Sequence, residues 1–366
     1  MRLFIQREDI LKPLLAVSSI VEKRQTMPIL SNILITANEQ GVSFTGTDLE
    51  VEAIVNLKTD VEQTGEITVS ARKLVDICKA LPDSSKIDLA VNDGKMQIRS
   101  GRSKFNLATL AAAEFPRLDN FVSTATLNLA PSTLKTLIDK TAFSMALQDV
   151  RYYLNGLLLE IQQGKLVAVG TDGHRLSLTS QAVDTGEIEG KQVILPRKAV
   201  LGLSRLLADE DGECVLQLTD NHIRLIFGDS VFTAKLIDGR FPDYGRVIPP
   251  YAEELVQGDK NQFRDALSRA AILASEKFRG VYLKIEPGSL WIRANNPDQE
   301  DAEEEVAIQY NGRPLEISFN AGYLLDAINA LESDDFIMSI QDETKSCIIR
   351  NADSEDSIYV VMPMRL

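Results

Sequence analysis

Three segments of this 366-residue chain repeat one pattern at a constant spacing. Each is a polar tetrapeptide after an apolar stretch, and successive copies start 124 residues apart: Thr47-Asp48-Leu49-Glu50, Thr171-Asp172-Gly173-His174 and Asn295-Asn296-Pro297-Asp298. A second series of similar segments starts at 71, 196 and 321. The period is too long for a solenoid repeat and matches the size of a small domain. We therefore expect three domains of one fold, at 1–122, 123–247 and 248–366.

Hydrophobic periodicity predicts the same order of elements in each domain. The first helix is expected at 8–24, 132–142 and 260–279. The strand before the repeated tetrapeptide is expected at 42–46, 166–170 and 290–294. The second helix is expected at 71–81, 196–206 and 321–331, with Pro196 in a first helical position, and later strands at 96–100, 222–227 and 347–350. The expected fold class is α+β, ordered helix, strands, helix, strands in every domain.

The second tetrapeptide raises the question of catalysis, because Thr171, Asp172 and His174 bring together a hydroxyl, a carboxylate and an imidazole. The first repeat has Leu49-Glu50 where the second has Gly173-His174, so the loop recurs without its polar groups. No G-x-S-x-G motif supplies a nucleophile. We interpret the segment as a turn and expect no enzyme activity. A hydrolase acting through Asp172 and His174 is the alternative, and it predicts that His174→Ala abolishes turnover.

Cysteine and histidine usage argues against disulfides, metals and cofactors. Cys78, Cys214 and Cys347 are odd in number and lie in apolar segments, so we expect three buried free thiols. Neither His174 nor His222 lies in a cluster with zinc-ligand spacing. The sequence contains no apolar run of membrane-spanning length and no signal-peptide pattern at its start. We therefore expect no membrane association and a cytoplasmic location.

Positive charge is concentrated in the six expected helices, although the chain carries a formal net charge of −14. In those ranges Lys and Arg outnumber Asp and Glu by eight. Helix propensity alone would favour Glu as strongly as Lys. Helices that face a common centre would form a positive lining that attracts a phosphate backbone without reading bases. A triplicated peptide-binding scaffold that never touches DNA is the alternative, and loss of these charges would not affect it.

Two charged segments suggest a contact between copies of the chain. Residues 298–305 contain six acids, and residues 100–107 are basic with alternating apolar positions. The acidic run is either a solvated loop or the partner of the basic strand. An exposed edge strand such as 100–107 invites pairing with another edge. Head-to-tail contact between the first domain of one copy and the third of another would close a two-fold ring.

Several motifs along the whole chain are specific to one family. They are Pro28–Leu30, Gly46–Glu50, Gln148–Gly156, Gly170–Leu176, Asp238–Tyr244, Glu276–Val281 and Tyr359–Leu366. With these motifs the chain resembles the bacterial sliding clamps, the β subunits of the DNA polymerase III holoenzyme. The resemblance implies a head-to-tail homodimeric ring, with helices lining the hole and sheets outside. It also implies a non-catalytic processivity factor that encircles duplex DNA and tethers polymerases to it.

The resemblance implies DNA contacts at Arg24, Arg72, Gln148, Tyr152 and Tyr153. The expected helix lining adds Lys73, Lys79, Arg197, Lys198 and Arg205. The two tyrosines could instead be aromatic residues at the start of a strand. Asp326 departs from the expected pattern, because it makes the last helix acidic.

A pocket between the second and third domains is implied as the binding site for short linear motifs of partner proteins. Its residues are Leu154, Thr171, Gly173, His174, Arg175, Leu176, Pro242, Arg246, Val247, Asn320, Tyr323, Ser346, Val360, Met362, Pro363, Met364 and Arg365. Alternation of Val360, Met362 and Met364 predicts a strand with one apolar face, and methionine adapts to different ligands. The implied partners are the DNA polymerase III alpha subunit, the clamp loader complex, translesion polymerases, mismatch repair proteins and initiation-control proteins.

The implied dimer interface joins apolar residues of the first domain to apolar residues of the third. Phe105 and Leu107 are expected to meet Ile272 and Leu273 of a second copy. Flanking basic and acidic residues are expected near one another: Arg102, Lys104, Glu300, Glu303 and Glu304.

Overall fold

The computed structural model describes residues 1–21, 27–118, 121–188, 190–208 and 210–365. The chain forms two compact units. The first unit contains Met1–Lys135 and Lys198–Leu236, and the second contains Thr136–Arg197 and Ile237–Leu366. The second repeat is therefore divided, with part of it in each unit.

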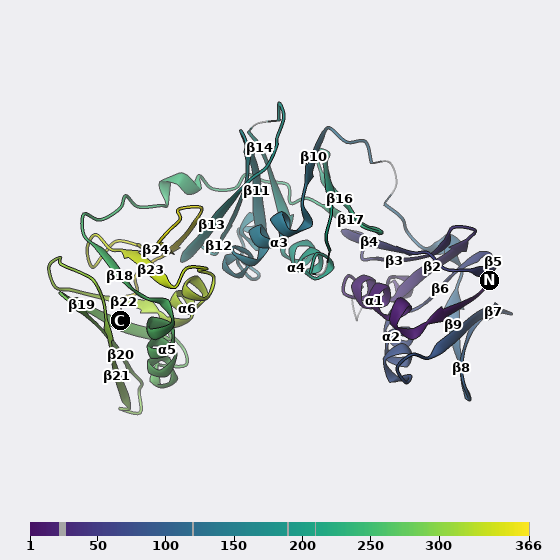
Figure 1. The fold of residues 1–366 in the computed structure, drawn as a ribbon, viewed down its shortest axis with the longest axis horizontal. Coiled ribbons are helices and arrows are strands. Elements are labelled where there is room, and N and C mark those ends of the chain that lie inside the picture. Colours follow the sequence, from purple (N-terminus) through teal and green to yellow (C-terminus); the bar gives the residue numbers. More distant parts are fainter. Residues whose placement is uncertain (22–26, 119–120, 189, 209, 366) are drawn as a thin grey trace. The chain divides into compact units, whose positions relative to one another are not determined.

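The first unit is built on one antiparallel sheet of thirteen strands (Figure 1). In sheet order these are β10 (Ala125–Leu129), β15 (Cys214–Leu218), β16 (His222–Phe227), β17 (Ser230–Lys235), β4 (Val51–Leu57), β3 (Gly41–Thr47), β2 (Asn32–Asn38), β6 (Gly65–Ser70), β9 (Ser103–Leu110), β8 (Lys95–Ser100), β7 (Lys86–Asn92), β1 (Arg2–Gln6) and β5 (Val61–Gln63). The pairing of β17 with β4 joins the second repeat to the first. Helices α1 (Arg7–Ser18) and α2 (Ala71–Ala80) pack against each other beside this sheet.

The second unit has an eight-stranded and a four-stranded antiparallel sheet. The first runs β14 (Lys191–Pro196), β11 (Gly156–Gln162), β12 (Lys165–Thr171), β13 (Arg175–Ala182), β25 (Ser357–Val361), β24 (Cys347–Asn351), β23 (Asp335–Ser339) and β18 (Leu255–Asp259). The second runs β21 (Asp301–Ala307), β20 (Ser289–Asn295), β19 (Gly280–Glu286) and β22 (Leu315–Asn320). The pairing of β13 with β25 joins the second repeat to the third.

The remaining helices are α3 (Pro131–Asp139), α4 (Arg197–Leu206), α5 (Lys260–Ala270) and α6 (Ala321–Asn329). Short 3-10 helices span Pro28–Ser31, Ala112–Glu114, Ala142–Ser144, Tyr152–Asn155, Tyr244–Arg246 and Ala271–Leu273. Helices α5 and α6 pack together, and the core beneath them is apolar. Within it the rings of Phe263 and Phe336 lie 4.9 Å apart.

All six expected strands are confirmed, because each lies within or coincides with β3, β12, β20, β8, β16 or β24. The expected first helix of the chain was too long. Helix α1 ends at Ser18, where the hydroxyls of Ser18 and Ser19 donate to the carbonyls of Leu15 and Ala16. Such bonds compete with the helical pattern and favour helix termination. The rest of the expected range reaches residues 22–24, which lie outside the described residues.

The other expected helices begin near the predicted residues but differ in detail. Pro196 ends β14 and precedes α4, so its assignment to a first helical position was wrong. Strand β14 is an edge of its sheet, and an edge tolerates the missing N–H of proline. Helix α5 stops at Ala270 and continues as a 3-10 turn to Leu273, well short of residue 279. Helices α3 and α6 end at Asp139 and Asn329.

The three cysteines are free and buried, as expected from the sequence. Burial raises the pKa of Cys78 to about 11, against a smaller opposing effect of Arg7, and raises the pKa of Cys214 to about 12. Burial also raises the pKa of Cys347. A thiol nucleophile must be deprotonated and accessible to react.

We therefore expect the native protein at pH 8 to leave a disulfide reagent such as 5,5′-dithiobis(2-nitrobenzoate) unconsumed. Three equivalents should react once the chain is unfolded in guanidinium. Rapid reaction of even one thiol in the native protein would contradict the burial of these side chains.

Candidate functional site

The loop between β12 and β13 is held by its own polar side chains. The Thr171 hydroxyl donates to the Arg175 carbonyl at 2.6 Å and accepts from the Gly173 amide at 3.1 Å. The Asp172 carboxylate accepts from the amides of His174 and Arg175, at 2.9 and 3.0 Å. Thr171 and Asp172 thus satisfy the backbone donors of a tight turn. Neither group is available as the acid, base or nucleophile of a hydrolase.

The first repeat forms the same turn with the same Thr-Asp pair, followed by Leu49-Glu50 in place of Gly173-His174. The Thr47 hydroxyl donates to the Val51 carbonyl at 2.9 Å and accepts from the Leu49 amide at 3.1 Å. The Asp48 carboxylate accepts from the amides of Glu50 and Val51. In the third repeat the Asn296 side chain accepts from two amides across a turn. The tetrapeptide recurs in the sequence because its side chains make the turn.

The absence of a side chain at Gly173 matters for its contact with Arg151 as well as for its backbone conformation. Its φ of 86° resembles the φ of 79° at Leu49, so a side chain is tolerated in this conformation elsewhere in the chain. At Gly173 a Cβ atom would lie 2.9 Å from the Arg151 guanidinium, which is closer than van der Waals contact allows. Glycine therefore leaves the space that the Arg151 guanidinium occupies beside the loop.

Arg175 connects this loop to α6. Its guanidinium donates to Asp172 at 3.1 Å, to Asp326 at 2.5 Å and to the Phe143 carbonyl at 2.6 Å. The same group lies 4.3 Å from the centroid of the Tyr323 ring, and the side chain is only 12% exposed. The unexpected acid of α6, Asp326, is thus one of three oxygen partners of a nearly buried cation.

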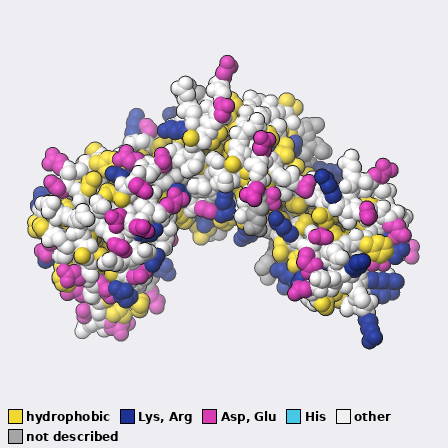
Figure 2. Space-filling model, viewed as in Figure 1, with side chains coloured by type: hydrophobic (Ala, Val, Ile, Leu, Met, Phe, Trp, Pro, Cys, Tyr) yellow, Lys and Arg dark blue, Asp and Glu magenta, His cyan; other side chains and the backbone are white. Residues whose placement is uncertain are grey.

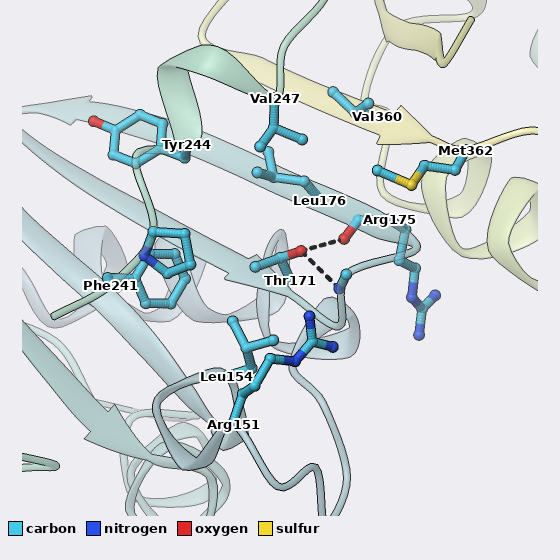
Figure 3. Close-up of a pocket in the computed structure, with 12 residues that line it drawn as sticks. Arg151, Leu154, Thr171, Arg175, Leu176, Phe241, Tyr244, Val247, Val360 and Met362 are labelled. Atoms are coloured by element: carbon cyan, nitrogen blue, oxygen red, sulfur yellow. Dashed lines mark hydrogen bonds between the residues drawn. The ribbon is translucent and has the colours of Figure 1, made fainter. Parts of the chain in front are cut away.

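Beside the loop lies a pocket of about 170 Å³. Figure 3 shows its side chains converging from β13, the 3-10 helix at 152–155, the segment 241–247 and the C-terminal strand. Its lining residues are Arg151, Leu154, Thr171, Gly173, Arg175, Leu176, Phe241, Pro242, Tyr244, Val247, Val360 and Met362. Most are apolar, with two arginines at the rim, as in sites for small ligands and peptide anchors.

Nine of the expected pocket residues line this cavity: Leu154, Thr171, Gly173, Arg175, Leu176, Pro242, Val247, Val360 and Met362. Others support its walls. The His174 carbonyl accepts from the Met362 amide at 2.9 Å, the Asn320 side chain caps α6, and Tyr323 stacks on Arg175. Arg246 is exposed and pairs with Asp243 at 2.9 Å. Ser346, Pro363, Met364 and Arg365 are not among the lining residues.

The expected strand through Val360, Met362 and Met364 was too long. Strand β25 ends at Val361, and the residues after it leave the sheet. Proline at 363 lacks an amide donor, so it cannot continue the ladder. The Met364 amide instead donates to the Ser318 carbonyl of β22 at 2.7 Å. Met362 is 38% exposed at the pocket edge, whereas Val360 is buried.

Three lining residues were missed: Arg151, Phe241 and Tyr244. All three lie inside motifs that were recognised in the sequence, in Gln148–Gly156 and Asp238–Tyr244. The recurrence of Phe-Pro at 115–116 and 241–242 was a further signal, because a repeated linker sequence suggests a repeated contact with the sheet.

Arg151 is fixed by an ion pair at the rim of the pocket. Its guanidinium donates to both carboxylate oxygens of Asp149, at 3.0 and 2.9 Å. These side-chain bonds, together with the Arg151 amide, lower the pKa of Asp149 to about 2.

We expect a nuclear magnetic resonance titration to give a midpoint near pH 2 for Asp149. In Arg151→Ala the midpoint should rise toward the ordinary value of about 4 but stay below it, because the backbone amide of residue 151 still donates to the carboxylate. A carboxyl group with a lowered folded-state pKa stabilises the fold above its unfolded pKa and loses this effect as pH falls through the folded value. The rim ion pair should therefore persist at pH 5. An unshifted Asp149 in the wild type would contradict the pairing.

Comparisons with known proteins cover the whole chain. Family models of the DNA polymerase III beta subunit match its N-terminal domain to residues 1–119, its central domain to 128–243 and its C-terminal domain to 245–365. The beta sliding clamps of Pseudomonas aeruginosa and Escherichia coli K12 are 49% and 44% identical, over 100% of each chain. The chain belongs to the DNA polymerase III beta sliding clamp family.

Solved structures agree with this assignment. A DNA polymerase sliding clamp from Pseudomonas aeruginosa has a TM-score of 0.94 at 49% identity, and a sliding clamp from Bartonella birtlesii has a TM-score of 0.96 at 38% identity. Both matches cover 100% of each chain. The expected α+β clamp fold with three domains is confirmed. A beta sliding clamp is a processivity factor and no enzyme, so the hydrolase interpretation of Asp172 and His174 is wrong.

The clamp residues expected to contact DNA differ in exposure. On α2, Arg72, Lys73 and Lys79 are exposed, and on α4 Arg205 is exposed. Arg197 and Lys198 are partly buried: Arg197 donates to the Met145 carbonyl, and Lys198 pairs with Asp48. Arg24 lies outside the described residues. On the face shown in Figure 2, basic and acidic side chains are interspersed in both units.

The loop before β11 carries the remaining residues expected at DNA. Gln148 has a positive φ of 57° and is exposed. Tyr152 is 57% exposed, while Tyr153 packs on the apolar cluster around Leu158 and Phe241. Their rings meet edge to face with centroids 5.8 Å apart.

The residues expected at a dimer interface lie on or beside two edge strands, β9 and β21, and in the 3-10 helix at 271–273. The basic segment 100–107 was expected to be one strand, but it is a hairpin: β8 ends at Ser100 and β9 starts at Ser103, with Arg102 in the turn. Lys104 is exposed, Phe105 is partly buried and Leu107 is buried. Strand β9 pairs with β6 only at Thr109 and Leu110, so its earlier part is an open edge.

The acidic run lies mainly on β21, an edge strand, so its interpretation as a loop was wrong. Within the chain Glu304 pairs with Arg269 at 2.7 Å, Glu303 pairs with Arg293, and Glu300 accepts from Asn296. Ile272 is 77% exposed beside the partly buried Leu273.

No helix in the described ranges is long and apolar enough to span a bilayer.

Proposed function

We propose that two copies of the chain form a head-to-tail ring that encircles duplex DNA, and that the pocket beside Arg175 tethers partner proteins to it. The domains proposed for each copy are 1–122, 123–247 and 248–366. Family membership supports the ring, and the apolar pocket supports tethering. The pocket is the observation that carries the proposal, because no catalytic group accounts for it and its arginine rim suits a short peptide.

DNA contact in this proposal is sequence-independent. The exposed Lys and Arg side chains of α2 and α4 would meet phosphates, and such contacts give no preferred register along the duplex. A net charge of −14 limits binding elsewhere on the surface. Weak contacts between the lining and the phosphates would then permit the protein to slide, while the closed ring would prevent it from dissociating from the DNA.

The proposed partners of the pocket are proteins of replication and repair that present short linear motifs. They are the DNA polymerase III alpha subunit, the clamp loader complex, translesion polymerases, mismatch repair proteins and initiation-control proteins. Structures of the relatives from Pseudomonas aeruginosa and Bartonella birtlesii are bound to griselimycin, a peptide-like ligand. We propose that griselimycin also binds this chain at the pocket. We also propose that the protein acts in the cytoplasm, where a bacterial chromosome would be accessible to it.

The ring predicts topological retention on DNA. The protein is loaded on nicked circular DNA by a matching clamp loader with ATP and Mg²⁺, and is then challenged with high salt. Retention on the circle and loss after linearisation is expected, because contact binding depends on salt and not on free ends. Equal loss from both forms would contradict the ring and favour a peptide-binding scaffold. Light scattering should give a mass twice that of one chain.

A further inference from the structure

Residues 237–248, here called the strap, cross the face of the sheet that carries the pocket. The Ile237 amide donates to the Ile194 carbonyl of β14 at 2.9 Å, which fixes one end. Phe241 is buried in the apolar cluster with Leu158 and Val360, and Ile248 packs on the same cluster. Between these contacts the strap supplies four lining residues of the pocket: Phe241, Pro242, Tyr244 and Val247. Pocket shape therefore depends on where the strap lies.

Tyr244 attaches the middle of the strap to the sheet through hydrogen bonds. Its hydroxyl donates to Oε2 of Glu160 on β11 and accepts from Gln162 Nε2 at 3.1 Å. Glu160 is itself held, because Gln162 donates to Oε2 at 3.0 Å and Gln192 of β14 donates to Oε1 at 2.9 Å. Both carboxylate oxygens are thus occupied, and the acceptor has a fixed orientation before the tyrosine binds it.

The ionisation of this pair suits the bond. Burial and the Glu160 carboxylate raise the pKa of Tyr244, so its hydroxyl keeps the proton that it donates. Burial alone would raise the pKa of Glu160, but the bonds from Tyr244, Gln192 and Gln162 outweigh it and lower the pKa. At neutral pH the contact is a charge-assisted hydrogen bond, which is stronger than a neutral one.

The first repeat has a comparable attachment at a neighbouring position, made by different residues. Phe115-Pro116 corresponds to Phe241-Pro242, so Arg117 stands where Asp243 does. Arg117 donates to Glu66 of β6 at 3.0 Å, and Glu66 lies opposite Thr36 just as Gln192 lies opposite Glu160. Glu66 therefore corresponds to Gln192 and lies on the strand next to the one that corresponds to β11. A tie between the linker and a carboxylate of the sheet recurs in the two repeats, although at neighbouring positions.

We infer that Tyr244 is a positioning residue of the pocket, which holds the strap against Glu160 in the arrangement that a ligand requires. The inference rests on the proposed binding function of the pocket. A strap that leaves this position reduces the fraction of protein competent to bind, and the apparent dissociation constant rises by the same factor. The strap is partly exposed and continues into a short 3-10 helix, so the loss of its tie moves it without unfolding the sheet.

Calorimetric titration with griselimycin tests the inference. Tyr244→Phe keeps the ring in its apolar cluster and removes only the hydroxyl, and we expect affinity about tenfold weaker. Glu160→Ala should weaken it equally, and the double variant no further, because both changes break one tie. Glu160→Gln retains an acceptor and should bind within about threefold of the wild type. Hydrogen exchange at the Val247 amide, which donates to the Tyr244 carbonyl, should accelerate in Tyr244→Phe.

Tyr310→Phe is the matched control, because it removes a hydroxyl that donates to the Arg313 carbonyl outside the pocket. Its affinity should equal that of the wild type. Unchanged affinity in Tyr244→Phe, or losses that multiply in the double variant, would overturn the positioning role. Failure of the wild type to bind griselimycin would instead overturn the proposed use of the pocket, so the two failures are distinguishable.

Discussion

The double variant Val247→Asp/Met362→Asp is expected to bind griselimycin at least about 100-fold more weakly than the wild type. Both side chains line the pocket, and they are 36% and 38% exposed. A ligand that covers them with apolar surface would strip water from two carboxylates, at a cost of several kcal/mol without a compensating partner. Because both side chains are already exposed to solvent in the free protein, the substitutions should change the unfolding temperature little.

Ile226→Asp is a suitable control for this variant. Ile226 is 36% exposed, as Val247 is, but lies on β16 of the first compact unit and is not among the lining residues of the pocket. Its griselimycin affinity should match that of the wild type in the same calorimetric titration. Retained tight binding by the double variant would show that the ligand sits elsewhere. The double variant should also lose binding of the polymerase alpha subunit and of the clamp loader, because both are proposed partners of the pocket.

Arg175→Met is expected to lower the free energy of unfolding by about 2–4 kcal/mol. The substitution keeps much of the side-chain volume but removes a cation that serves Asp172, Asp326 and the Phe143 carbonyl. Asp172 and the carbonyl would remain in place with fewer partners, whereas Asp326 is 45% exposed and can turn to water. Urea denaturation at pH 7 measures the loss.

Two further variants show whether the loss of stability comes from the positive charge of Arg175, from its planar hydrogen-bonding group, or from the removal of any arginine at the pocket. Arg175→Lys keeps the charge but cannot reach three oxygens with one planar group, so an intermediate loss is expected. Arg151→Met removes an exposed arginine whose ion pair with Asp149 is close to the surface, so it should destabilise the fold much less than Arg175→Met does. Equal stability of Arg175→Met and Arg151→Met would contradict the central role of Arg175.

The strands and repeats could be predicted because their signals are local. Alternating apolar residues bounded by turn residues mark a strand in a single window, and the tetrapeptides recur because Thr47, Asp48, Thr171 and Asp172 make the same hydrogen bonds in each turn. Helix ends were predicted less well. At Ser18 and Ser19 the competing side-chain bonds are individually weak, and periodicity carries no information about them.

The site was predictable only in part, because its essential contacts are distant in sequence. Asp326 seemed out of place because it makes the last helix acidic, and its partner Arg175 is 151 positions away. Tyr244 lies 84 positions from Glu160, and no pattern around either residue predicts the pair. Most of the expected pocket residues came from family resemblance. The residues that were missed are those whose role depends on the path of a linker over a sheet.

The pairing of β17 with β4 sets an order for folding during synthesis. Strand β4 belongs to the first repeat, but its outer neighbour comes from residues 230–235 of the second. Until those residues leave the ribosome, the edge of β4 exposes unpaired amides and carbonyls. The first compact unit therefore cannot close when the first repeat is complete; it must wait for more than a hundred further residues. During that interval the nascent chain carries an open sheet edge that a chaperone could cover.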